Sequence, residues 1–170
     1  MSRSVHCSFE PAGPGDAAAL AVLHTAVAEH LTGLHGPGPW SAKTSEKGVL
    51  YAMRNSNVFV ARQGSEIAAT LRLAVKKPWA IDIRYFSPCS RPVYLLAMAV
   101  APARQSQGIG RWCLEQAKRA ARAWPADALR LDAYDASAGG GGFYERCGWT
   151  EKRRVKYRGV PLIYYEFLLK

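Results

Sequence analysis

Two glycines and two arginines stand at the predicted junction between a buried strand and a helix, in the stretch RQSQGIGR, residues 104–111. The first backbone N–H groups of such a helix have no acceptor within the helix, and the helix dipole adds positive potential there. Gly108 and Gly110 lack the Cβ atoms that would keep a ligand away from the backbone. Arg104 and Arg111 add positive charge beside them. The stretch therefore predicts a phosphate-binding turn; a tight turn whose glycines serve packing alone is the alternative.

This turn does not match two familiar phosphate-binding motifs. The dinucleotide-binding pattern GxGxxG fails because Cys113 stands at the third glycine position, and a P-loop fails because no GK[ST] follows. A glycine-rich turn alone is a weak signal. Any functional interpretation therefore depends on the surrounding elements and on a second motif.

A buried strand and a long helix must position this turn. Residues 93–101 are apolar at every position, which predicts a strand buried on both faces, and Pro102 ends it. Residues 109–124 predict an amphipathic helix with Glu115 and Arg119 as a favourable i, i+4 pair on its polar face. That polar face comprises Arg111, Glu115, Lys118, Arg119 and Arg122. The apolar face comprises Ile109, Trp112, Cys113, Gln116, Ala117, Ala120, Ala121 and Trp124.

The remaining elements are short and follow in a recognisable order. Asp16 is expected to cap the first helix, Gly64 and Ser65 to turn a hairpin, and Gly148 to follow a short helix at its C-terminus. The strand–helix–strand unit over 93–134 predicts two parallel strands, and the other pairs resemble hairpins. The chain is therefore predicted to form a mixed α+β sheet. The further predicted strands are 4–10, 57–63, 66–75, 128–134, 149–157 and 161–170; the further helices are 17–31, 45–54 and 143–147, and segment 76–92 is an irregular connection.

Composition and charge limit the protein class. The 170 residues favour one domain spanning 1–170. No run of eighteen apolar residues and no apolar signal segment is present, so neither a membrane span nor secretion is expected. The four cysteines lack CxxC or zinc-ligand spacing, which favours reduced thiols in the cytoplasm and no metal. The net charge of +10 attracts polyanions, but the densest basic cluster, residues 152–158, favours a solvated strand face over a nucleic-acid surface.

Two motifs at a suitable separation carry a family resemblance. Residues 105–110, QSQGIG, have the form Q/R-x-x-G-x-G/A, and residues 143–149, FYERCGW, are similar to an FYxxxGF segment. Together they resemble the signatures of the GNAT superfamily, the acyl-CoA-dependent N-acetyltransferases. The order of elements agrees over nearly the whole chain. The resemblance implies a mostly antiparallel sheet of six or seven strands, helices on both faces, and a central parallel pair that splays to form the acyl-CoA cleft.

The resemblance also implies where acetyl-CoA (coenzyme A) binds. Backbone amides of residues 105–111 would hold the pyrophosphate, residues 98–100 would pair with the pantetheine arm, and an N–H near Val100 would stabilise the oxyanion. Ser137 stands where the family often has an Asn that contacts pantetheine. The implied cofactor-binding residues are Met98, Ala99, Val100, Gln105, Ser106, Gln107, Gly108, Ile109, Gly110, Arg111, Ser137 and Phe143.

The second motif implies that Tyr144 is catalytic. A thiol has a reference pKa of about 8.5 and tyrosine one of about 10, so a neutral tyrosine can hydrogen-bond to the departing sulfur or protonate it. The alternative is a core tyrosine beside Phe143 and Cys147. The glycine run 139–142 replaces the family's helix start; since each helical glycine costs roughly 1 kcal/mol relative to alanine, the helix is expected to begin near Gly142, with the run as slack loop or as room for the acceptor.

The acceptor amine and its general base stay open at this point. An alkylamine is almost fully protonated at pH 7, so a base would help, and none of the five candidates is preferred. Loops 33–41 and 76–92 are expected to shape the acceptor pocket. The candidate bases are Asp132, Asp135, Glu66, His30 and His35, and the candidate pocket walls are Trp40, Trp79, Tyr85 and Phe86.

Three functions are compatible with these observations. The first is an N-acetyltransferase that moves the acetyl group of acetyl-CoA to a primary amine, of a small molecule or of a protein or peptide, by direct attack on the thioester. The second is a non-catalytic acyl-CoA-binding regulatory module. The third is an acetyltransferase that acts on aminoacyl-tRNA, suggested by the +10 charge. The expected partners are acetyl-CoA and an amine, with a homodimer as an open possibility.

Overall fold

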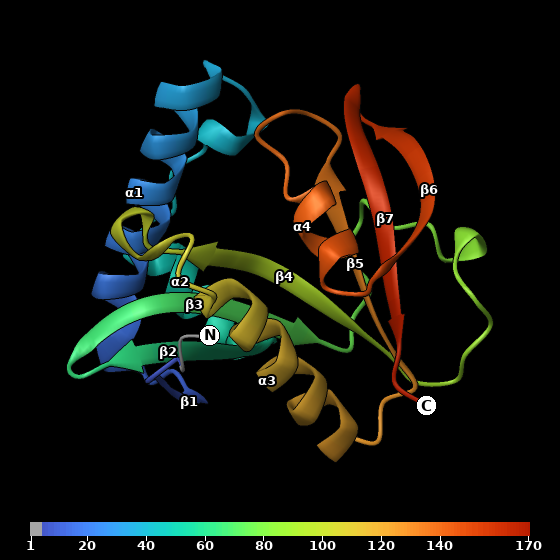
Figure 1. The fold of residues 1–170 in the computed structure, drawn as a ribbon, viewed down its shortest axis with the longest axis horizontal. Helices are drawn as coiled ribbons and strands as arrows, with labels where there is room; N and C mark the ends of the chain where they lie inside the picture. The colour runs from blue at the N-terminus through green and yellow to red at the C-terminus, as the bar shows by residue number, and fades with distance from the viewer. Residues whose placement is uncertain (1–4) are drawn as a thin grey trace.

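A seven-stranded sheet forms the centre of the protein in the computed structural model, which describes residues 5–170 (Figure 1). The strand order is β1-β2-β3-β4-β5-β7-β6, and β4–β5 is the one parallel pair between neighbours in this sheet. The predicted α+β class, the mostly antiparallel sheet and its central parallel pair are therefore confirmed. The strands are β1 Ser8–Pro11, β2 Asn57–Gln63, β3 Glu66–Ala74, β4 Pro92–Val100, β5 Ala128–Tyr134, β6 Thr150–Tyr157 and β7 Val160–Leu168.

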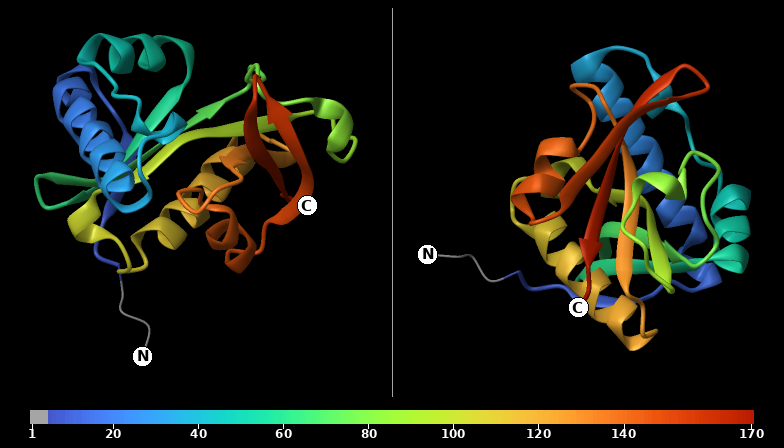
Figure 2. Two further views of the ribbon diagram at one scale, coloured as in Figure 1. Left: turned by 90° about the horizontal axis from the view of Figure 1, so that it is seen from above. Right: turned by 90° about the vertical axis from the view of Figure 1, so that its right-hand side faces the viewer.

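Helices cover both faces of the sheet, as predicted. Helices α1 (Ala17–His35) and α2 (Glu46–Asn55) lie on one face, and α3 (Ile109–Ala123) and α4 (Gly141–Arg146) lie on the other (Figure 2, left). Short 3-10 turns connect several elements. They are η1 Pro14–Asp16, η2 Pro39–Ser41, η3 Ile83–Tyr85 and η4 Pro102–Arg104.

The parallel pair diverges along its length, which splits the sheet into two parts. Strands β4 and β5 pair over residues 92–94 and 128–130 alone. Opposite β3, strand β4 carries an extra residue around Ala97, where the backbone φ is +48°. The prediction that residues 93–101 are buried on both faces is thus wrong for the second half, since Ala97 is exposed. Beyond the bulge, the apolar side chains line a cleft and are not covered by a second packed layer.

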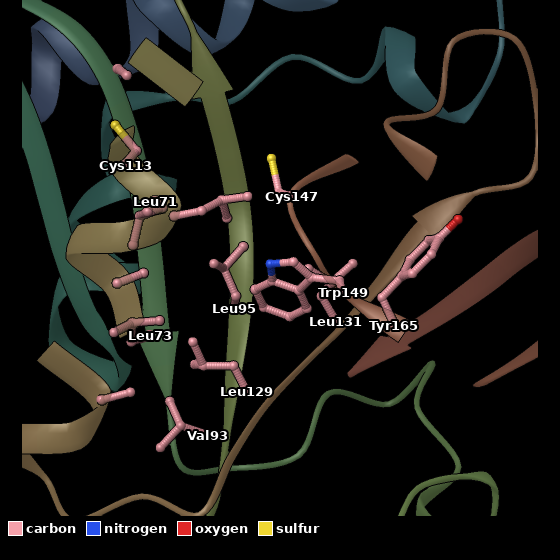
Figure 3. Packing of buried hydrophobic residues seen from close by; sticks show 14 of the residues in the cluster. Leu71, Leu73, Val93, Leu95, Cys113, Leu129, Leu131, Cys147, Trp149 and Tyr165 are labelled. Carbon is pink, nitrogen blue, oxygen red and sulfur yellow. The ribbon is translucent and has the colours of Figure 1, made fainter. Parts of the chain in front are cut away.

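The main core lies between the sheet and α3, with Trp149 and Tyr165 completing it beneath the splayed strands (Figure 3). The predicted apolar face of α3 is buried at Ile109, Cys113, Ala117 and Ala121. The other buried members named in Figure 3 come from the central strands and α4's C-terminal end: Leu71, Leu73, Val93, Leu95, Leu129, Leu131 and Cys147.

Lys118 contradicts its predicted place on the polar face of α3. Its side chain is 5% exposed, and its ammonium lies 3.7 Å from the centre of the Phe167 ring. It pairs with Glu115 at 2.6 Å, whereas no ion pair joins Glu115 to Arg119 among the described residues. A lysine can bury its aliphatic stem in this way because the aromatic face and one carboxylate meet its charge.

Helix α1 differs from its prediction at both ends. Asp16 is the N-cap residue of α1, as predicted, but its side chain makes no capping hydrogen bond to that helix; its carboxylate accepts the Gly13 N–H at 2.9 Å within η1 and pairs with Arg62 at 2.6 Å. The helix continues past residue 31 to His35. By length and composition it is the one described segment that could cross a membrane. Four of its residues, Ala17, Leu20, Leu23 and Ala28, are buried in the fold.

The first strand is shorter than predicted. Strand β1 covers Ser8–Pro11, and the predicted start at Ser4 lies outside the described residues. Val5, Cys7 and Phe9 still pack against the main core, as their alternation suggested. Val5 and Cys7 therefore pack on the core although the described residues 5–7 belong to no strand.

The connection 76–92 packs against the far part of the sheet through a buried ionic cluster. Arg130 and Glu166 pair at 3.0 Å, with side chains that are 4% and 2% exposed. Arg130 also donates to the Ser87 carbonyl at 2.6 Å, and the Ser87 N–H donates to Glu166 at 3.2 Å. This cluster holds the connection against β5 and β7.

Candidate active site

A cleft of about 830 Å³ opens where β4 and β5 diverge. It is lined by the second half of β4, the turn between η4 and α3, the end of β5, residues 138–140, α4 and one side of α1. Such a cleft at a splayed parallel pair is what the family resemblance implied. Ten predicted site residues line it: Met98, Ala99, Val100, Gln105, Ser106, Gly108, Gly110, Arg111, Phe143 and Tyr144.

Three predicted cofactor residues lie elsewhere. The Gln107 side chain donates to the Ala103 carbonyl at 3.2 Å and is exposed. Ile109 is 1% exposed within the main core, so only its backbone faces the turn. Ser137 is exposed and does not line the cleft. The predictions for these three side chains therefore find no support in their positions, although the amides of Gln107 and Ile109 still belong to the turn.

The turn before α3 has the backbone shape that an anion site needs. Gly108 precedes the helix with φ of +83°, a conformation that side chains disfavour. Ser106 has φ of +60° despite its side chain. Such strained residues concentrate at functional sites. Arg104 and Arg111 line the same end of the cleft, and Arg111 donates to the Arg146 carbonyl at 3.0 Å.

Tyr144 stands on α4 with its hydroxyl directed at β4. Its oxygen lies 4.0 Å from the sulfur of Met98, and its ring packs against Trp149 and Tyr165 with centroids 5.8 and 5.7 Å away. Burial, and to a lesser degree the charge of Asp132, raises the pKa of Tyr144 above its ordinary value. The hydroxyl is consequently protonated at neutral pH, as a proton donor must be.

The glycine run beside Tyr144 is tightly packed, which corrects its interpretation as slack loop. A Cβ atom added at Gly139 would collide with the Tyr134 carbonyl, and one at Gly141 would lie 2.8 Å from the Tyr165 hydroxyl. At Gly140 the added atom would lie 3.1 Å from the Tyr144 ring. Close packing thus requires glycine at residues 139 and 141, and α4 begins at Gly141, one residue before the predicted start.

Among the five candidate bases, Asp132 alone lines the cleft. Burial raises the pKa of its carboxyl above the ordinary aspartate value. No cation within residues 5–170 forms an ion pair with it. By contrast, Glu66 pairs with Arg104 at 2.9 Å and Asp135 pairs with Arg154 at 3.0 Å.

The aromatic residues proposed as pocket walls divide into two groups. Trp40 packs edge-on against Tyr134, a cleft residue, with ring centroids 5.9 Å apart. The residues of the 76–92 connection lie away from the cleft: Phe86 is buried on Tyr164, and Trp79 is 84% exposed. That connection therefore does not shape the pocket.

Sequence reasoning missed several cleft residues. Val27 and Leu31 are one turn apart on α1, and they supply the wall opposite the sheet. Their i, i+4 spacing on the predicted first helix was the available signal. Tyr134 continues the alternation of Asp132 on β5, and Arg146 lies inside the second motif.

The basic cluster 152–158 is engaged with neighbouring side chains. Lys152 and Arg154 form ion pairs, and Arg153 and Arg158 lie over tyrosine rings at 5.2 and 5.3 Å. The cluster belongs to the edge strand β6, outside the cleft. These contacts favour the interpretation as a solvated strand face.

Comparisons with known proteins agree with this geometry. The sequence profile of the acetyltransferase (GNAT) family matches residues 25–149, more than half of the chain. No curated protein sequence is a significant match.

Solved structures of the same shape cover almost the whole chain. A GNAT-family acetyltransferase from Listeria monocytogenes superposes with a TM-score of 0.77 at 15% identity, over 99% of this chain and 98% of that one. The yncA protein of Salmonella typhimurium, solved with its cofactor acetyl-CoA, gives 0.70 at 17% identity, over 98% and 95%. The ribosomal-protein-S18-alanine N-acetyltransferase of Escherichia coli gives 0.71 at 17% identity, over 96% and 94%. At these identities, the likeness is one of fold.

Proposed function

This chain belongs to the acetyltransferase (GNAT) family, and from that premise we propose that it transfers an acetyl group from acetyl-CoA to a primary amine. One observation carries the proposal. A single cleft has the glycine turn and three arginines toward one end, and Tyr144 and Asp132 line the same cleft. Acetyl transfer from acetyl-CoA to an amine that arrives protonated uses three such groups: a phosphate-binding end, a proton donor and a proton acceptor.

The residues of the cleft fit acetyl-CoA. The N–H groups at the start of α3 suit its pyrophosphate, since a Cβ atom added at Gly108 would have only the Val5 side chain within 4 Å. Gly110 instead makes room for the Phe143 ring, which would lie 3.1 Å from an added Cβ atom. Arg104, Arg111 and Arg146 supply positive charge nearby. Beyond residue 94, strand β4 has no partner in β5, so its edge is free to pair with an extended pantetheine arm.

The proton transfers can then be assigned to residues. Acetyl-CoA supplies the thioester whose carbonyl carbon accepts the amine. Asp132 takes one proton from the incoming ammonium, which frees the nitrogen lone pair. As nitrogen bonds to the acetyl carbon, the carbon–sulfur bond breaks, and the Tyr144 hydroxyl protonates the departing sulfur. A second proton of the nitrogen then reprotonates Tyr144, and the proton held by Asp132 passes to water. The products are an amide, a free thiol and one proton.

The two other functions receive less support. A regulatory module would not need an unpaired acid and a buried tyrosine in the same cleft. An RNA-directed enzyme would need a free basic surface, whereas four basic residues of the cluster 152–158 contact neighbouring side chains. The four free cysteines support the cytoplasm as the expected compartment.

Calorimetry and thiol release together test the proposal. We expect acetyl-CoA to bind and free CoA thiol to appear with at least one amine. Tyr144→Phe should lower kcat by about 100-fold or more, the scale of a lost proton donor, while acetyl-CoA affinity stays nearly unchanged. The matched control is Tyr51→Phe, because Tyr51 is 62% exposed on α2, outside the cleft.

Three results would count against it. No binding of acetyl-CoA or CoA at high micromolar concentration would reject the function. Binding without thiol release from any amine would favour the regulatory module. Unchanged turnover in Tyr144→Phe would remove Tyr144 from the mechanism.

A further inference from the structure

The end of the cleft that faces α1 differs chemically from the end that faces α3. Its walls are Val27 and Leu31 of α1, Leu96 and Ala97 of β4, and Tyr134 of β5. Leu95 and Leu131 fill the base between the diverging strands (Figure 3). Apolar walls of this kind stabilise an apolar ligand by removing its surface from water.

One charge interrupts this apolar end. Asp132 is the one acidic residue among the described cleft residues, and no lysine or histidine lines the cleft. The cleft arginines, Arg104, Arg111 and Arg146, belong to η4, α3 and α4. Among the lining residues, a bound carboxylate or phosphate at the α1 end would thus find no cation, and a second ammonium would find no second acid. Arg72, in register with the wall residue Leu96, lies outside this lining and hydrogen-bonds to Ser56 at 3.4 Å. An unpaired charge in such surroundings is costly.

The α1 end is also bounded by the loop that follows α1. Trp40 donates from its ring nitrogen to the Gly36 carbonyl at 2.9 Å, which fixes the ring within the loop. The same ring packs against Tyr134 at 5.9 Å, so the loop reaches the end of β5. Figure 1 shows the loop that follows α1 beside the segment that follows β5. Contact between the loop and β5 favours a compact ligand over an extended chain.

We infer that the acceptor is a compact amine with one ammonium group, an apolar aliphatic or aromatic body, and no anionic group. This inference rests on the proposed function and names the substrate class of the same cleft. Asp132 meets the ammonium, and the α1 end encloses the apolar body. Amino acids, phosphorylated amines, polyamines and peptides are excluded as preferred acceptors.

Matched acceptor pairs test each part of the inference in the wild-type protein. Phenethylamine and phenylalanine differ by one carboxylate, and pentylamine and cadaverine differ by one ammonium. We expect kcat/KM, read as CoA thiol release, to be at least about tenfold higher for the first member of each pair, since a charge without a partner is penalised. A short peptide with N-terminal phenylalanine should be as poor as phenylalanine. Equal rates within either pair, or preferred use of the peptide, would overturn the inference.

A charge placed in the wall should change the preference. Leu31→Arg puts a cation into the apolar wall at the α1 end. Because the carboxylate of phenylalanine would gain a partner, we expect the ratio of phenethylamine to phenylalanine activity to fall at least about tenfold. The matched control is Leu34→Arg, on the same helix, because Leu34 is 64% exposed and lies outside the cleft. Equal shifts in both variants would place the acceptor elsewhere.

Binding measurements distinguish a failure of this inference from a failure of the proposed function. If acetyl-CoA does not bind, the proposed function fails. If CoA binds but no acceptor releases thiol, calorimetry of phenethylamine and phenylalanine with the CoA complex decides the inference. Selective binding of phenethylamine, weakened by Leu31→Arg and not by Leu34→Arg, would support the site. No binding of phenethylamine, or equal binding of both, would overturn it.

Discussion

At the scale of single residues, the proposed chemistry depends on two acids placed in the same buried surroundings. Burial raises the pKa of both Asp132 and Tyr144. For the aspartate this makes the carboxylate a stronger base than an ordinary surface aspartate. For the tyrosine it keeps the hydroxyl protonated at neutral pH, and it also makes that hydroxyl a weaker acid. One environment thereby makes the acceptor more basic and keeps the donor protonated.

Asp132→Asn should lower activity while raising stability at neutral pH. Because the pKa of Asp132 is higher in the folded state than in the unfolded chain, its stabilising contribution is greatest below the unfolded pKa. That contribution is lost as pH rises through the folded pKa, so the ionised group destabilises the fold at pH 7. Urea titrations should show the variant more stable than wild type at pH 7, with the difference shrinking toward pH 4.

The same substitution should reduce kcat/KM by about 100-fold, the scale of a lost base. In wild type, kcat/KM should fall with decreasing pH as Asp132 protonates, at a pH above the ordinary aspartate range. A loss of both stability and activity in Asp132→Asn would show that the aspartate is structural. Asp135→Asn is the matched control, since Asp135 pairs with Arg154 outside the cleft.

At the scale of elements, the turn between η4 and α3 converts a strand end into a ligand site. Pro102 ends the strand path, η4 reverses the chain, and Gly108 allows α3 to start with its first N–H groups toward the cleft. The bulge at Ala97 lies in the part of β4 that no longer pairs with β5 and that lines the cleft. Both features use left-handed backbone, with φ of +83° at Gly108 and +48° at Ala97.

Gly108→Ala should weaken acetyl-CoA binding. An alanine there strains the backbone by about 1–2 kcal/mol, and relief of that strain would displace the N–H groups of the turn. Calorimetry should show an affinity loss of about tenfold or more, in proportion to this strain. Gly64→Ala is the matched control, since Gly64 has φ of +62° in the β2–β3 turn. It should cost similar stability without changing affinity; equal affinity losses would show a general effect of strain.

At the scale of the whole molecule, two parts of the sheet meet at a narrow base. Strands β4 and β5 share pairs over three residues each, and beyond them the cleft separates the parts. The main core joins them on the α3 side (Figure 3). On the opposite face, Arg130 and Glu166 tie the 76–92 connection to β5 and β7.

Glu166→Gln should therefore lower stability strongly and leave the cleft chemistry nearly intact. Removing one partner of a buried ion pair typically costs about 3–5 kcal/mol, because the other charge stays buried. Chemical denaturation should show this loss, with KM for acetyl-CoA nearly unchanged. Glu29→Gln breaks an exposed pair with Lys43, whose side chain is 66% exposed, and should change stability by less than about 1 kcal/mol. Comparable losses in both variants would contradict the role of burial.

The amino-acid sequence by itself determined the features that local patterns encode. The order of elements, the parallel pair and the glycine turn all follow from hydrophobic periodicity, from glycine and proline residues that end elements, and from helix-end signals. Each of these signals is carried by residues close together in the sequence. Gly148, with φ of +84°, also stands where the short helix was predicted to end. The two motifs supplied the family and ten residues that line the cleft.

Only the tertiary structure decided which side chains meet across the cleft. Asp132 and Asp135 look alike in sequence, yet one lines the cleft and the other pairs with Arg154. Lys118 is buried because Phe167, distant in sequence, lies over it. The glycine run is tight because Tyr165 of β7 packs against it. Each outcome depends on contacts between distant segments, which local propensity does not contain.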